Sequence, residues 1–156
     1  MSRLYFRGTD AAALGANFVR EGRTTSKRAL RHMRQVAKLV MNQSIANSPV
    51  DWKGYSSKDK PRHELERSHR IEEQFGNSGR LEATVLVGGM VDGTDVDLYA
   101  TWLHESFSYQ LGPASRKKTM MSAKNKVGPL FLERALAEHE DEFDDLLDDL
   151  MQGLMG

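Results

Sequence analysis

Cysteine is absent from the 156-residue sequence. The chain therefore has no disulfide bond, no thiolate ligand for a metal ion and no cysteine nucleophile. Long apolar runs are also absent, since no stretch approaches the ~18–20 residues that a membrane-spanning helix needs. The first ten residues lack the apolar core of a secretory signal peptide. We therefore expect neither a membrane partner nor secretion by that route.

An excess of either charge is likewise missing, because 22 lysines and arginines balance 22 aspartates and glutamates. This balance argues against a uniformly basic nucleic-acid binder and against a strongly acidic solvating chain. The charges are nevertheless segregated along the chain. Residues 1–78 carry 15 basic and 8 acidic side chains, a net of +7, whereas residues 79–156 carry 7 and 14, a net of −7.

Length and composition predict one domain over residues 1–156, with enough apolar residues (39%) for a single core. A short strand at 4–6 and a weak helix over 11–20 are expected first. After a possible helix cap at 24–26, apolar residues recur at helical spacing from Ala29 to Ile45, which predicts a long helix that ends at Pro49.

The second half of the sequence predicts strands followed by a helix. Apolar residues at 81, 83, 85 and 87 alternate with the residues between them, which indicates a half-buried strand, and Gly88-Gly89 and Asp92-Gly93 indicate turns. Residues 96–100 suggest a second strand or the start of a short element. Pro129 is placed to open a long last helix. The predicted fold class is α+β, a small antiparallel β-sheet flanked by a long helix in the N-terminal half and a C-terminal helix.

Two polar stretches, 49–63 and 106–128, are interpreted as extended loops or arms, a type of segment that is often functional when longer than about 12–15 residues. Aromatic residues concentrate binding energy when an arm folds onto a partner. The candidate docking anchors on the arms are Trp52, Tyr55, Phe107 and Tyr109. Tyr99 and Trp102 are expected in the core instead. The second arm also carries basic residues that could face DNA, namely Arg116, Lys117, Lys118, Lys124 and Lys126.

Common catalytic patterns do not occur in the sequence. No Gly-Lys-Ser/Thr follows a glycine-rich loop, and the serine between Gly76 and Gly79 has the wrong spacing for a nucleophile elbow. His104-Glu105 starts like a zinc-protease helix, but the position of the second histidine is occupied by Ser108. A turn with three aspartates misses the calcium-loop spacing and is interpreted as solvated; these are Asp92, Asp95 and Asp97. We expect no catalytic residue, metal or cofactor, and by elimination no enzyme.

The two long helices are predicted to carry opposite charges. The helix face over 27–38 is basic, and residues 133–149 hold nine acidic side chains and one basic one. Acidic residues crowded on one helix repel each other, and a basic surface on a neighbouring copy would turn that repulsion into attraction. This suggests a head-to-tail ring. The candidate inter-subunit residues are Arg28, Arg31 and Arg34 on one face, and Glu138, Asp141 and Asp145 on the other.

The order of several short motifs resembles the head–tail joining family of tailed bacteriophages, also called neck, tail-completion or minor tail proteins. The resemblance spans about residues 4–150. The motifs are Phe6-Arg7-Gly8, Ala46-Asn47-Ser48-Pro49, Val85-Leu86-Val87-Gly88, Tyr99-Ala100 with Glu105 just after, and Gly128-Pro129-Leu130-Phe131-Leu132-Glu133-Arg134-Ala135-Leu136.

This resemblance implies a structural virion protein that is made in the host cytoplasm. It implies a ring, six copies in the family, which joins the capsid connector or adaptor to the tail and lets DNA pass through its channel. Its partners would be other copies of itself, the adjacent connector and the tail terminator or tail tube proteins, with transient non-specific contact to genomic DNA. A tail terminator ring that caps the tail tube is an alternative. A DNA-binding accessory protein that uses the basic helix 27–38 is an alternative of another class.

Overall fold

The computed structural model describes residues 23–52, 63–75, 81–106 and 108–155. The strand predicted at 4–6 and the helix predicted over 11–20 lie outside these ranges. The predicted long helix is confirmed as α2, Arg23–Asn47, and it ends immediately before Ser48 and Pro49. Among the described residues, no helix is both long enough and apolar enough to cross a bilayer.

The predicted α+β class is confirmed. After α2 the elements are α3 Glu64–Arg67, β1 Arg70–Phe75, β2 Leu81–Leu86, β3 Met90–Val91, β4 Thr94–Asp95, α4 Asp97–Glu105, α5 Pro113–Met121, α6 Phe131–Glu138 and α7 Glu140–Met155. The strands form two antiparallel hairpins. β1 pairs with β2 in the register Arg70↔Leu86 to Phe75↔Leu81, and β3 pairs with β4.

The turn between β3 and β4 confirms one local prediction. Asp92 and Gly93 both have positive φ, 48° and 80°. That backbone conformation suits the twist of a two-residue hairpin and favours an Asp-Gly sequence. The predicted strand at 81–87 forms as β2, but it is buried on both faces rather than half-buried, since Thr84 and Leu86 are as buried as Ala83 and Val85.

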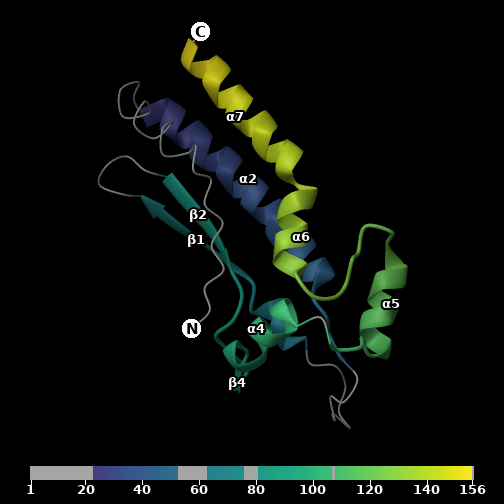
Figure 1. Cartoon of the computed structure of the whole chain (residues 1–156). Coiled ribbons are helices and arrows are strands. Elements are labelled where there is room, and N and C mark those ends of the chain that lie inside the picture. The colour runs from purple at the N-terminus through teal and green to yellow at the C-terminus, as the bar shows by residue number, and fades with distance from the viewer. Residues whose placement is uncertain (1–22, 53–62, 76–80, 107, 156) are drawn as a thin grey trace.

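Helix α2 is the central element of the core (Figure 1). The β1–β2 hairpin packs along one side of α2, and α6 and α7 pack along another. The buried side chains that meet there include Val36 and Val40 of α2, Val85 of β2 and Phe131 of α6. Phe131 and Leu103 of α4 are fully buried, so α4 closes the core at the C-terminal end of α2.

Two expected elements differ from the structure, and for a third the structure has one of two alternatives. Of the strand and the short element expected over 96–100, it has the short element, helix α4 at Asp97–Glu105, which follows directly after β4 ends at Asp95. The stretch 106–128 is not an extended arm, since it contains α5, whose Pro113 occupies the first helical turn. The last helix is interrupted at His139, whose backbone (φ −119°, ψ 20°) is not helical, and this separates α6 from α7.

Candidate functional site

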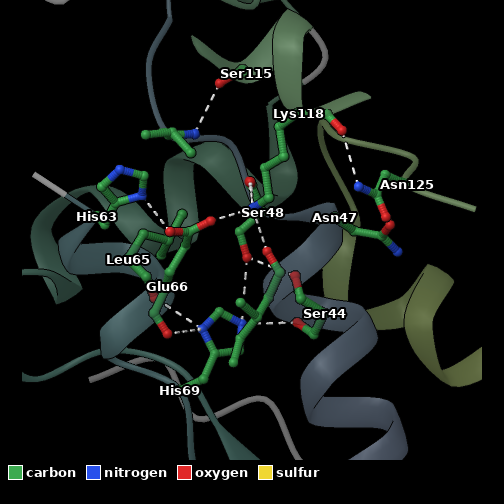
Figure 2. Close-up of polar contacts among 12 residues, drawn as sticks. Ser44, Asn47, Ser48, His63, Leu65, Glu66, His69, Ser115, Lys118 and Asn125 are labelled. Atoms are coloured by element: carbon green, nitrogen blue, oxygen red, sulfur yellow. Dashed lines mark hydrogen bonds and ion pairs between the residues drawn. The ribbon is translucent and has the colours of Figure 1, made fainter. Parts of the chain in front are cut away.

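A cluster of buried polar side chains lies where α2 ends (Figure 2). Lys118 of α5 points into this end: its ammonium group donates to the carbonyl oxygens of Ile45 and Ser48, the latter at 2.8 Å, and pairs with the Glu66 carboxylate. The last carbonyls of a helix lack partners within the helix and carry its negative dipole end, so a cation stabilises them. Burial lowers the pKa of Lys118, and Glu66 opposes this shift. The DNA-facing prediction for Lys118 is therefore wrong, because its side chain is only 16% exposed.

His69 occupies the same cluster. Its Nδ1 lies 2.9 Å from the carbonyl oxygen of Leu65 and 3.2 Å from that of Glu66, so the ring proton belongs on Nδ1. Nε2 then accepts a hydrogen bond from the Ser44 hydroxyl at 2.9 Å. Burial lowers the pKa of His69 from 6.5 to about 4. This Ser44–His69 contact differs from that of a catalytic Ser-His-Asp triad. Ser44 is fully buried, and the group that holds the histidine ring is a backbone carbonyl in place of a carboxylate. The contact therefore stabilises the end of α2 and exposes no nucleophile.

Asp51 caps the N-terminus of α5 from a distant part of the sequence. Its carboxylate accepts hydrogen bonds from the backbone N–H groups of Ala114 (3.0 Å) and Ser115 (2.7 Å). Burial alone would raise the pKa of Asp51, but these hydrogen bonds outweigh it, and the pKa is lowered. The Ser115 hydroxyl in turn donates to the Asp51 carbonyl oxygen at 2.7 Å and accepts from the Val50 N–H at 2.8 Å. The first residues after Pro49 are thus held against α5.

The segment after α5 is also bound to α2. The Asn47 side-chain oxygen accepts the Lys126 N–H at 2.9 Å, and the Asn47 carbonyl accepts the Gly128 N–H at 3.1 Å. One helical turn earlier, Gln43 donates to the carbonyl of Lys124 at 3.0 Å. Both predicted arms therefore meet at the C-terminal end of α2 in their described parts.

Aromatic residues from the two arms pack together on α4. The Trp52 ring lies 5.8 Å from Tyr99 and 6.1 Å from Trp102, and Trp102 lies 5.3 Å from Tyr109, measured between ring centroids. The Tyr109 hydroxyl donates to the Leu103 carbonyl at 2.9 Å, and burial raises its pKa to about 12. Such tilted ring pairs stabilise the packing beyond the area they bury.

The structure describes two of the four predicted docking anchors. Trp52 and Tyr109 are half-buried against the core of their own chain, while Tyr55 and Phe107 lie outside the described residues. The core prediction for Trp102 is wrong, because 44% of this residue is exposed. Its neighbour Leu98, one helical turn earlier on α4, is 80% exposed.

Several charged residues that were predicted to contact another copy are paired within the chain. Arg28 contacts Asp149 at 3.3 Å, and Arg34 donates two hydrogen bonds to Glu73 of β1, at 2.6 and 2.7 Å. The hydrogen bonds from Arg34 lower the pKa of Glu73. Glu138, another predicted inter-subunit residue, has its Oε1 2.8 Å from Nζ of Lys126, a residue that was predicted to face DNA.

Other predicted charged residues are exposed. These are Arg31 on α2, Asp141 and Asp145 on α7, Arg116 and Lys117 on α5, and Lys124 after it. Within the described part of the chain, no opposite charge lies at ion-pair distance from any of them. These exposed charged residues therefore form one acidic surface on α7 and two separate basic surfaces, one on α2 and one on α5.

Little in the sequence indicates the buried polar cluster. Asp51 and Ser115 are 64 residues apart, and the contact between Ser44 and His69 spans 25 residues. The one local signal was Gly112-Pro113, a helix-start pattern, but the few apolar residues of α5 follow no helical stripe. Among the described residues, no group of three or more histidine, aspartate or glutamate side chains could hold a metal ion.

Comparison with known proteins gives no relative for this chain. No family model, no curated protein and no solved structure matches it.

Proposed function

We propose that this protein is a structural subunit of the bacteriophage neck, which assembles head-to-tail into a ring that joins the capsid connector to the tail and lets DNA pass. The motif order described above, from Phe6-Arg7-Gly8 to the residues that follow Gly128-Pro129, supports this role. In a head-to-tail ring each copy offers two different surfaces, and the two must complement each other.

One observation about charge carries the proposal. Helix α7 presents four exposed aspartates with no basic partner at ion-pair distance in the described part of the chain, and these are Asp141, Asp144, Asp145 and Asp148. Like charges this close on a helix are unfavourable on an isolated monomer. Exposed basic residues lie on other elements, Lys27 and Arg31 on α2 and Arg116 and Lys117 on α5. A neighbouring copy could therefore neutralise α7.

The location in the particle tests the neck role directly. We expect an antibody against the chain to label purified virions at the junction of head and tail. Deleting the gene should yield filled heads and free tails that join when the purified protein is added. Labelling at the far end of the tail tube, or absence of the protein from virions, would contradict the proposal. Free tails of irregular length in the deletion would favour the tail terminator instead.

Assembly in solution tests the acidic surface. Replacing Asp141 and Asp145 with lysine should weaken ring formation, measured by light scattering after size-exclusion chromatography and by negative-stain microscopy. The control makes the same change of charge at two exposed residues elsewhere, Glu105→Lys with Glu133→Lys, and should leave assembly unchanged. Individual exposed pairs contribute only ~0–1 kcal/mol, so two or more must be reversed together. A chain that stays monomeric with its partners present and binds DNA in a salt-sensitive way would contradict the ring.

A further inference from the structure

A groove of about 580 Å³ runs between α2 and α7. Three apolar residues line it, Val36, Leu39 and Leu146, of which Val36 and Leu146 are buried and Leu39 is 41% exposed. The polar residues on the α2 side are His32 and Gln35. Four carboxylates line the α7 side, namely Glu142, Asp145, Asp148 and Asp149. The groove thus combines the exposed apolar side chain of Leu39 with negative charge, which fits a segment that carries apolar and basic side chains together.

Helix α5 presents such a combination on its outer side. Arg116 and Lys117 are exposed, and one helical turn further on Met120 and Met121 are 86% and 77% exposed. Residues four apart lie next to each other on a helix, so each basic side chain neighbours a methionine. The helix contains no acidic residue. Methionine is flexible and adapts to an apolar groove.

The rest of α5 is fixed to its own chain. Lys118 holds it to the C-terminal end of α2, and Asp51 and Ser115 hold its first turn. Figure 1 shows α5 standing apart from the α2–α7 pair, beyond α6. A copy in this conformation cannot place its α5 in its own groove, which lies further toward the N-terminal end of α2.

We propose that the exposed side of α5, with Arg116, Lys117, Met120 and Met121, docks into the α2–α7 groove of the next copy. This inference rests on the proposed ring and names the contact that builds it. The basic residues of α2 fit less well, because Arg34 is paired with Glu73, and among the described side chains Lys27 and Arg31 have no exposed large apolar residue beside them outside the groove. A protrusion that fits a groove elsewhere on the same molecule gives a heterologous contact, which closes into a ring when the rotation allows.

Charge exchange between two variants tests this contact. The first variant carries Arg116→Glu and Lys117→Glu, and the second carries Asp145→Lys and Asp148→Lys. Each variant alone should associate about tenfold or more weakly than the unchanged chain, since two attractive pairs become repulsive. An equimolar mixture should regain assembly, because each α5 then meets an oppositely charged groove on a copy of the other variant. Circular dichroism checks that both variants remain folded.

Cross-linking gives a second measurement, which the absence of native cysteine makes clean. A chain with Met120→Cys mixed with a chain with Leu39→Cys should form a covalent heterodimer with a short bismaleimide. The control replaces Leu39→Cys with Leu98→Cys, which is exposed on α4 and lies outside the groove. The control should give little heterodimer.

The possible results of these experiments distinguish the α5 contact from the neck role. Rings that form without the Met120–Leu39 cross-link, or that are not restored in the mixture, would overturn the α5 contact and leave the neck role standing. A cross-link between Phe6→Cys and Leu39→Cys within one chain would place the chain's own N-terminal segment in the groove, and would also overturn it. A cross-link in a protein that is absent from virions would support the contact and contradict the neck role.

Discussion

Lys118 Nζ lies 2.8 Å from the carbonyl oxygen of Ser48, the residue that follows α2. Through this contact α5 closes the C-terminal end of the longest described helix, although the two residues are 70 positions apart. The ammonium group also pairs with Glu66 of α3, so one side chain joins three helices.

Replacing Lys118 with methionine should lower the free energy of unfolding by about 2–3 kcal/mol, because two carbonyl groups and the Glu66 carboxylate lose their cation in a mostly buried position. Urea denaturation followed by circular dichroism measures the change. The control is Lys117→Met on the exposed side of α5, which should change stability by no more than about 0.5 kcal/mol. Equal effects of the two substitutions would show that the junction contributes little.

Stability should fall as the pH is lowered from about 6.5 to about 4, in part because of His69. The pKa of His69 is lowered from 6.5 to about 4 by burial, so in this range the unfolded chain binds a proton that the folded chain does not. The unfolded state is therefore favoured as pH falls, by about 3 kcal/mol over the full range, and the contribution is constant below pH 4.

Comparison with the variant His69→Asn isolates this effect. Asparagine keeps a donor for the Leu65 carbonyl but does not titrate, so its stability should depend less on pH. The measurement is the urea midpoint at pH 7, 5.5 and 4 for both proteins. Parallel pH profiles would mean that His69 titrates normally in the folded protein.

Gly112→Ala should destabilise the protein by about 1–2 kcal/mol, the range expected for loss of a helix cap. A Cβ at this position would lie 2.3 Å from the Asp51 carboxyl carbon, and so the carboxylate that caps α5 would have to move. The effect of Gly112→Ala should be smaller in an Asp51→Ala background, where the clash is absent. Additive effects of the two substitutions would contradict this explanation.

Trp52→Ala should lower the free energy of unfolding by about 2 kcal/mol or more, and by more than Trp102→Ala. The Trp52 side chain is half-buried against the core and its ring packs on Tyr99 and Trp102, whereas 44% of Trp102 is exposed. Thermal unfolding of both variants provides the comparison. A larger loss of stability for Trp102→Ala would contradict this explanation.

The sequence alone predicted the parts of the fold that depend on local patterns. The apolar stripe of α2 and Pro49, which ends the helix, were sufficient to predict α2. A helix with one buried side shows the helical period in the spacing of its apolar residues. The Asp92-Gly93 turn was predicted for a similar reason, since few residues tolerate positive φ. The opposite charges of the two halves were also visible without a structure.

Tertiary structure decided how the charged and polar residues are used. Nothing near Lys118 in the sequence distinguishes it from Lys117, yet Lys118 is buried against the end of α2 and Lys117 is exposed. Likewise, Arg34 pairs with Glu73 while Arg31 does not, because only Arg34 lies opposite β1. Long-range packing sets these differences, and it also brings Leu39 and the carboxylates of α7 into one groove.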